Sequence, residues 1–133
     1  MADSSEQIDK VRQQFTRQAD AYIRTRQASD AAGLLGLAAL SGAKAGDRAL
    51  DVACGPGFLT MALASRCASA VGFDATDAFL ERARAEAARR GLANVSFRAG
   101  DAERLPFPDA SFDVVTCRAA FHHFARPERV LAE

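Results

Sequence analysis

Residues 49–57 read Ala-Leu-Asp-Val-Ala-Cys-Gly-Pro-Gly, a short apolar run that carries one acid, Asp51, and closes in a glycine turn. The run is bounded by turn residues and is too short for an ordinary helix, which is typical of a strand. A stretch with helical character, residues 58–66, follows directly. Because glycine has no Cβ, its backbone can pass close to a ligand. The stretch therefore predicts a strand, a turn and a helix, with a ligand site at the turn.

The same alternation of short apolar runs and helical stretches continues on the C-terminal side. Strands alternating with helices of this kind indicate βαβ units and a parallel sheet, so the predicted class is α/β. Thr76 is a plausible N-cap for a helix that carries Phe79, Leu80, Ala83 and Ala87 at helical spacing and stops at Gly91. The predicted strands are residues 48–53, 70–73, 94–99 and 112–117, and a last helix is predicted to begin at Pro127.

The N-terminal third has a different pattern, which predicts helices without strands. We expect one helix over residues 6–28 and a second from a cap at Asp30 through Leu40. Residues 41–47 have the composition of a turn. We therefore divide the chain into N-terminal helices, 1–42, and an α/β domain, 43–133. The expected apolar stripes are Phe15, Ala19, Tyr22 and Ile23 in the first helix and Leu34, Leu35, Leu37 and Leu40 in the second.

Composition excludes several classes of protein. The 133 residues include 17 basic and 17 acidic side chains, so the net charge is zero, which argues against a nucleic-acid or anionic-membrane partner. No apolar run approaches the roughly 18 residues that a membrane span needs. The three cysteines form no C-x-x-C pair, so we expect neither a disulfide framework nor a metal site, and a cytoplasmic location.

Acidic residues lie at or beside the ends of three predicted strands. They are Asp51, Asp74 and Asp101. In a parallel sheet, ligands bind outside the carboxyl ends of the strands. An ionised aspartate accepts several hydrogen bonds, so one that follows the second strand suits the two hydroxyls of a ribose. The pattern predicts a cofactor that contains adenosine.

The glycine turn discriminates between such cofactors. A dinucleotide-binding turn has the pattern G-x-G-x-x-G, whereas residues 55–60 read Gly-Pro-Gly-Phe-Leu-Thr and lack the third glycine. Asp51 would also repel a pyrophosphate but would suit a cationic amino group. S-adenosylmethionine has that ammonium group, a sulfonium and a ribose, and it has no phosphate. The charges favour it over NAD, and a nicotinamide-dependent oxidoreductase is kept as the weaker alternative.

An ordered set of motifs resembles the class I S-adenosylmethionine-dependent methyltransferases. Residues 49–57 look like their first motif, and residues 71–74 resemble their acidic ribose-binding strand end. The branch that includes the ubiquinone/menaquinone-biosynthesis enzymes, the methyltransferase type 11 domain, has the closest pattern. Its later motifs are similar to residues 100–107 and 111–115, its N-terminal helix to residues 15–22, and its segment after the fourth strand to residues 120–124.

The resemblance implies a role for each matching residue. Asp51 would orient the methionine amino group, Asp74 would bind the ribose hydroxyls, and Asp101 would accept from the adenine amino group, with Ala102 beside the ring. Ala53 stands where the family commonly has glycine. His122 and His123 are weak candidates for a general base, and the catalytic residues are otherwise unassigned. The implied cofactor-binding residues are Tyr22, Asp51, Ala53, Gly55, Pro56, Gly57, Asp74, Ala75, Asp101, Ala102 and Arg118.

The resemblance also implies a Rossmann-like sheet of seven strands in the order 3-2-1-4-5-7-6, of which the sequence supplies the first four, 3-2-1-4. We therefore expect a chain truncated at its C-terminus, with a fourth strand whose open edge could pair with a second copy. The expected activity is methyl transfer from S-adenosylmethionine to a small acceptor, quinone-like or another metabolite. The alternative from a different class is a cofactor-binding module that does not catalyse.

Overall fold

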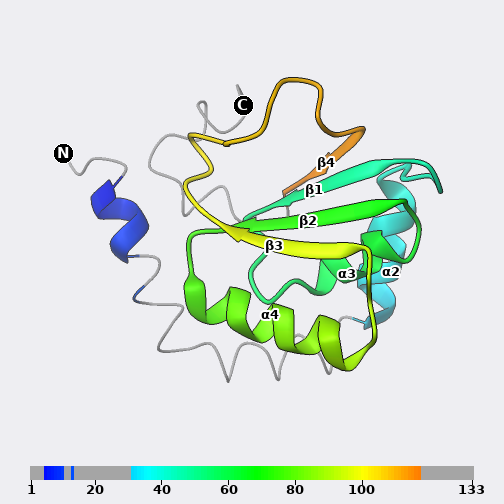
Figure 1. Ribbon diagram of the computed structural model, residues 1–133, viewed down its shortest axis with the longest axis horizontal. Coiled ribbons are helices and arrows are strands. Elements are labelled where there is room, and N and C mark those ends of the chain that lie inside the picture. The colour runs from blue at the N-terminus through cyan, green and yellow to red at the C-terminus, as the bar shows by residue number, and fades with distance from the viewer. Residues whose placement is uncertain (1–4, 11–12, 14–30, 118–133) are drawn as a thin grey trace.

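The computed structural model describes residues 5–10, 13 and 31–117 of the chain. Residues 5–10 are helical, and Lys10 pairs with Glu6 at 2.9 Å across one turn (Figure 1). The rest of the helix predicted over 6–28, the cap at Asp30 and the helix from Pro127 lie outside the described residues. The remaining elements are α2 (Ala31–Leu40), β1 (Arg48–Val52), α3 (Phe58–Ala64), β2 (Ser69–Asp74), α4 (Asp77–Arg89), β3 (Val95–Ala99) and β4 (Val114–Thr116).

The four described strands form one parallel sheet in the order β3-β2-β1-β4. Strand β1 lies in the interior, with Asp51 opposite Gly72 of β2 on one side and opposite Thr116 of β4 on the other. The carboxyl ends of β1, β2 and β3 therefore lie next to one another along one edge of the sheet (Figure 1). The predicted α/β class and strand order 3-2-1-4 are confirmed.

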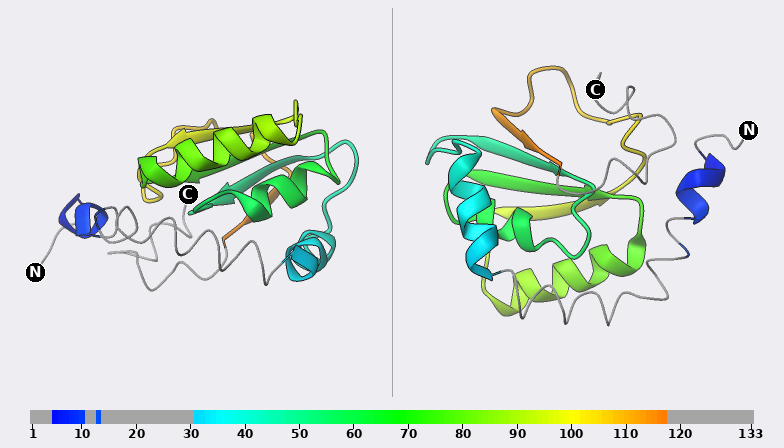
Figure 2. Two further views of the ribbon diagram at one scale, coloured as in Figure 1. Left: turned by 90° about the horizontal axis from the view of Figure 1, so that it is seen from below. Right: turned by 180° about the vertical axis from the view of Figure 1, so that it is seen from behind.

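The two faces of the sheet are covered differently, because successive side chains on a strand point to opposite faces. On one face, Ala49, Ala70 and Phe97 pack with residues of α2, α3 and α4 (Figure 2). On the other face, Leu50, Val52 and Phe73 are covered by the loop of residues 100–113. The loop contributes Ala102, Leu105, Phe107 and Phe112 to that second cluster, and the Phe107 ring meets Phe73 and Phe112 edge to face.

Helix α4 follows the sequence pattern closely. Its four buried residues are the four predicted ones, Phe79, Leu80, Ala83 and Ala87. Thr76 occupies the N-cap position, and Gly91, just beyond the helix, has a φ of +68°, the left-handed conformation that commonly ends helices. From the same helix, Arg84 donates to the Phe97 carbonyl of β3 at 3.0 Å, which satisfies one acceptor on that edge strand.

The predicted apolar face of α2 was wrong in part. The helix forms where it was expected, but among residues 32–40, whose burial is described, only Leu34 and Ala38, one turn apart, are buried. The other three leucines of the predicted face, Leu35, Leu37 and Leu40, are 57, 38 and 85% exposed. Every residue of α2 is apolar or glycine, so the sequence contains no polar face that would show which side packs.

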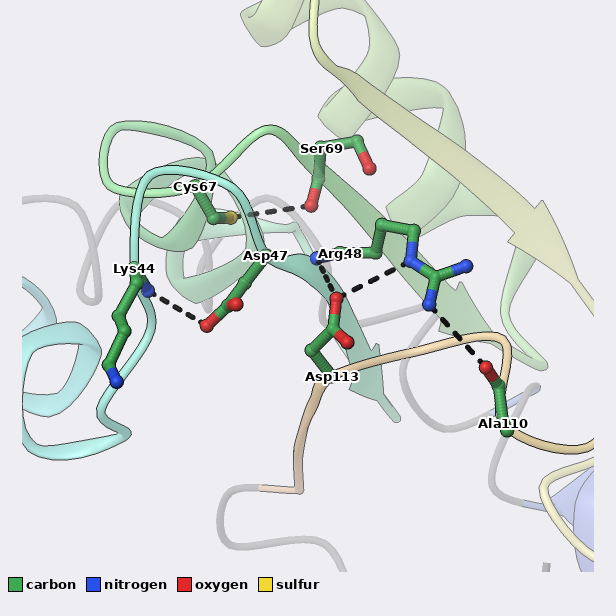
Figure 3. Close-up of polar contacts among 7 residues, drawn as sticks. All are labelled: Lys44, Asp47, Arg48, Cys67, Ser69, Ala110 and Asp113. Atoms are coloured by element: carbon green, nitrogen blue, oxygen red, sulfur yellow. Dashed lines mark hydrogen bonds and ion pairs between the residues drawn. The ribbon is translucent and has the colours of Figure 1, made fainter.

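The first residue of β1 is held by the turn that precedes β4 (Figure 3). The Asp113 carboxylate accepts from the Arg48 backbone N–H at 2.9 Å and from its Nε at 3.4 Å, and the Asp113 N–H donates to the Arg48 carbonyl at 2.8 Å. Arg48 also donates to the carbonyl of Ala110 at 3.5 Å. These contacts join residues 62 to 65 positions apart and give Asp113 a structural role.

Strand β4 has no partner on its outer side within the described part of the chain. It covers three residues, fewer than predicted, and Val115 is 60% exposed on it. In the ranges that the structure describes, no helix combines the length and apolar character needed to cross a bilayer.

Candidate functional site

A tight turn connects β1 to α3 and forms the centre of the site. Cys54 donates its N–H to the Phe73 carbonyl at 3.1 Å, which extends the contact between β1 and β2 by two residues. Gly57 then donates to the Cys54 carbonyl at 3.0 Å, and Met61 donates to the Gly57 carbonyl at 2.9 Å. The helix therefore starts immediately after the turn, with Gly57 at its N-cap.

The two glycines of the turn have different roles. Both have a positive φ, +56° at Gly55 and +82° at Gly57. A Cβ added to Gly57 would lie 2.6 Å from Cε1 of Phe97, so this glycine lets the turn pack on the ring below it. A Cβ added to Gly55 would meet nothing within 4 Å. The open space beside the turn is therefore at Gly55.

Ala53 precedes the turn and also adopts a left-handed conformation, with a φ of +57°. Residues other than glycine are strained in this conformation because their Cβ approaches the backbone. The glycine that the methyltransferase resemblance expects at this position would adopt this conformation without that strain.

Asp74 links the end of β2 to the turn. Its Oδ2 accepts from the Gly55 N–H at 2.9 Å, and its Oδ1 accepts from the Thr76 N–H at 2.8 Å. Burial raises the pKa of this carboxyl above its ordinary value, while the hydrogen bonds from Gly55 and Thr76 oppose the rise. The Ala75 N–H also lowers this pKa, so the carboxylate has a further local donor, and Asp74 as a whole is half-buried.

Asp51 lies in the layer between β1 and α3 and is only 2% exposed. Its Oδ2 accepts from the hydroxyl of Thr60 on α3 at 2.8 Å. Its Oδ1 accepts from the hydroxyl of Thr116 on β4 at 2.9 Å. The side chain is therefore fixed by two separate elements.

The turn lies in a negatively charged environment. Burial, followed by the negative charges of Asp74 and Asp51, raises the pKa of the Cys54 thiol well above its ordinary value. Burial and Asp51 raise the pKa of Cys117, at the end of β4, to about 11. Both thiols are therefore protonated near neutral pH and are poor nucleophiles. The same field disfavours a phosphate and favours a cation.

The third acid, Asp101, follows the end of β3. Gly100 donates its N–H to the Asp74 carbonyl at 3.0 Å, which holds the ends of β2 and β3 together. The Asp101 Oδ1 accepts from the Glu103 N–H at 2.9 Å, so the side chain also stabilises its own turn. Ala102, next to it, packs beside Phe73 in the second cluster.

The structure thus brings most of the predicted residues to one edge of the sheet. Asp51, Pro56 and Gly57 are buried, and six residues are half-buried: Ala53, Gly55, Asp74, Ala75, Asp101 and Ala102. Tyr22, Arg118, His122 and His123 lie outside the described residues. In the part of the chain that is described, no group of His, Cys, Asp and Glu side chains is arranged to hold a metal ion.

Sequence reasoning missed Thr60, Thr116 and Phe97. Thr60 had a visible signal, because it is the only residue with a polar side chain in the seven-residue helix α3, all of which is buried. A buried hydroxyl needs a hydrogen-bond partner. Thr116 and Phe97 had none, because their roles depend on strand register and on the space left by glycines of other elements.

Comparison with known proteins identifies the family. A family model described as "Methyltransferase domain" matches residues 50–133, which include the turn and all three acids. The chain belongs to this methyltransferase family. The resemblance found in the sequence motifs is therefore confirmed.

Similar proteins come from several bacteria. The uncharacterized methyltransferase YcgJ of Bacillus subtilis is 41% identical over 90 residues, which are 68% of this chain and 36% of that protein. Its crystal structure has a TM-score of 0.71 over 74% of this chain and 43% of that chain. The demethylmenaquinone methyltransferase of Thermus thermophilus is 45% identical over 92 residues, 68% of this chain and 41% of that enzyme.

A second similar structure contains a ligand. It is the S-adenosylmethionine-dependent methyltransferase of Thiobacillus denitrificans in complex with S-adenosylhomocysteine, 32% identical, with a TM-score of 0.53 over 63% of this chain and 34% of that chain. The matches to these three proteins thus span about two fifths of their lengths or less.

Proposed function

We propose that the chain binds S-adenosylmethionine beside Gly55, as part of an enzyme that transfers its methyl group to a small acceptor. The observation that supports this most directly is the open space at Gly55 with Asp74 beside it. Apart from Gly55 and its two chain neighbours, no atom of the described residues lies within 4 Å of a Cβ built at Gly55, and the neighbouring Asp74 is a half-buried carboxylate of the kind that accepts from hydroxyls.

The charge of the site supports this cofactor over a dinucleotide. Asp51 and Asp74 flank the turn. Burial is the main cause of the raised pKa of the Cys54 thiol, and the negative charges of both aspartates raise it further. A pyrophosphate would bring negative charge into that field. S-adenosylmethionine would bring a sulfonium and an ammonium group, both positive.

Each residue would hold a different part of the cofactor. Asp74 would accept from the ribose hydroxyls, and the backbone of residues 53–57 would follow the methionine and ribose. Asp51 would face the amino group, and Asp101 with Ala102 would take the adenine. When bound, the cofactor supplies a methyl group on a positively charged sulfur that departs as a neutral thioether. The protein then has to align the acceptor and exclude water, which needs no nucleophilic side chain.

The acceptor that we propose is a small molecule, quinone-like or another metabolite. Its support is the name of the Thermus thermophilus relative, which is a demethylmenaquinone methyltransferase. We assign the described residues to the cofactor side of the site, together with Tyr22 and Arg118 from outside the described part, and leave the acceptor side unassigned. His122 and His123, also outside that part, are proposed as candidates for a general base.

Isothermal titration calorimetry with S-adenosylmethionine and S-adenosylhomocysteine tests the cofactor. We expect both to bind, and we expect no response to NADH. Asp74→Asn should weaken binding about tenfold or more, because an acceptor for the ribose is lost. Asp109→Asn, an exposed turn residue away from the site, is the matched control. Binding of NADH without binding of S-adenosylhomocysteine would refute the proposal.

A further inference from the structure

Two threonines approach the buried carboxylate of Asp51 from different elements. Thr60 lies on α3 and is fully buried, while Thr116 lies on β4 and is half-buried. Both are outside the set of residues that the methyltransferase motifs assign to the cofactor. Because β4 pairs with β1 in a register that sets Thr116 opposite Asp51, the two side chains meet on the same face of the sheet.

The hydrogen bonds divide the carboxylate between the two threonines. Thr60 donates to Oδ2 at 2.8 Å and Thr116 donates to Oδ1 at 2.9 Å. Each hydroxyl has one hydrogen, and in both threonines it is donated to the Asp51 carboxylate. Two anchors on different oxygens, one from a helix and one from a strand, fix both the position and the plane of the carboxylate group.

Neither threonine neutralises the charge that it holds. Hydroxyls are neutral, so they donate to a carboxylate without cancelling its negative charge. Burial is the largest cause of the raised pKa of Cys54 and of Cys117, and the charge of Asp51 raises the pKa of both thiols further. A lysine or arginine in the same place would cancel the field that a cationic ligand needs.

The direction of the Thr60 hydroxyl also argues against a purely local role. A threonine within a helix can satisfy its hydroxyl by donating to the carbonyl four residues earlier. Thr60 donates instead to a side chain on the sheet, nine residues away in sequence. The bond therefore serves Asp51 rather than the helix.

We propose that Thr60 and Thr116 are positioning residues that hold the Asp51 carboxylate in place for the amino group of the cofactor's methionine part. This inference rests on the proposed function. It predicts that the hydroxyls contribute to binding of the amino-acid part of the cofactor and leave binding of its adenosine part unchanged.

Two ligands separate these contributions. S-adenosylhomocysteine carries the amino-acid part, whereas 5′-methylthioadenosine keeps the adenosine and the thioether without it. By calorimetry on the full chain, Thr60→Val should weaken binding of S-adenosylhomocysteine about tenfold, since a hydrogen bond to a charged group is lost. Binding of methylthioadenosine should stay within about twofold, because that ligand has no group for Asp51 to hold.

Three further variants sharpen the test. Thr60→Ser keeps the hydroxyl and should restore binding of S-adenosylhomocysteine to the wild-type level. Thr116→Val should reproduce the selective loss from the other side of the carboxylate. Ser65→Ala removes a hydroxyl from the exposed end of the same helix, where it donates to the Ala62 carbonyl, and should bind both ligands as the wild type does.

The outcomes distinguish this inference from the proposed function. If the wild type binds neither ligand, the proposed function fails. If it binds both and the valine variants weaken them equally, or weaken neither, the positioning role is overturned. Loss of folding in both valine variants, seen by circular dichroism, overturns it as well, because the hydroxyls would then be structural.

Discussion

Ala53 is, with Ala110, one of two residues other than glycine that have a positive φ in the described part of the chain. Its φ of +57° places a Cβ where the left-handed conformation leaves little room, and this costs roughly 1–2 kcal/mol. The conformation is imposed from both sides, by β1 before it and by the turn at Cys54 after it. Cys54 in turn is held by its bond to the Phe73 carbonyl. The strain is therefore stored where the chain leaves the sheet toward the site.

Replacing Ala53 by glycine should stabilise the protein. The variant Ala53→Gly removes the strain but loosens the unfolded chain, so the free energy of unfolding should rise by about 0.5–1 kcal/mol. Urea denaturation followed by circular dichroism measures it. The control is Ala85→Gly in the exposed interior of α4, which should lower the stability by about 1 kcal/mol. Equal losses in the two variants would show that Ala53 is not strained.

At the scale of residues, the sequence predicted the residues whose role depends on positions close to them in the sequence. Gly55 and Asp74 were found because a glycine turn and an acid at a strand end are local patterns. Thr116 could not be found, because its contact with Asp51 depends on a register between strands 65 residues apart. Asp51 itself was predicted near the cofactor, but its burial between α3 and β1 was not visible in the pattern.

At the scale of elements, α4 carries its own electrostatic stabilisation. Glu86 accepts from Arg89 at 2.6 and 2.9 Å and from Arg90 at 2.8 Å, one turn further along the helix. The hydrogen bond from Arg89, with further contributions from Arg90, lowers the pKa of Glu86 to about 2. The ionised form is therefore favoured in the folded state.

Stability of the protein should depend on pH through Glu86. Because its pKa is lowered on folding, the contribution is complete above about pH 4.5 and is lost as the pH falls toward about 2. Glu86→Gln should lower the free energy of unfolding by about 0.5–1 kcal/mol at pH 7, as expected for two helical ion pairs. Thermal unfolding from pH 7 to pH 2 measures the difference, which should shrink with acidity. Glu81→Gln, exposed on the same helix, should change less, and a pH-independent Glu86→Gln difference would contradict the mechanism.

Helices α2 and α4 explain why one apolar face was predicted correctly and the other was not. In α4, charged residues alternate with apolar ones, so the helical period points to a single buried stripe. In α2 there is no charged residue, and the position of α3 decides that Leu34 and Ala38 are buried while Leu40 stays exposed. Periodicity is informative only when a helix has a polar side.

At the scale of the whole molecule, the two edges of the sheet differ. On β3, Arg84 occupies the Phe97 carbonyl, which blunts that edge against another strand. On β4, Val115 is 60% exposed, and no strand within the described residues pairs with the outer side of β4. The order of strands was predictable from the motifs, whereas the protection of the β3 edge depends on a long side chain from a different element.

Self-association should therefore occur through β4. We expect the oligomeric fraction of the 133-residue chain to grow with concentration in multi-angle light scattering. Val115→Lys should shift it toward the monomer, because a lysine on an edge strand opposes pairing. Ser96→Lys, exposed on the opposite edge, should leave it unchanged. A wild-type monomer at every concentration would rule out pairing through this edge.

The contact between Arg48 and Asp113 also sets an order of events during synthesis. Strand β1 can pair with β2 as soon as residue 74 has been made, but its other edge stays bare until Asp113 and Thr116 follow. A nascent chain that has reached only α4 thus has β1 as an open edge strand, and Asp51 still lacks the hydroxyl donor from Thr116. About forty residues beyond Asp74 must be made, by the spacing of β2 and β4, before the fold can shield β1 from unwanted partners.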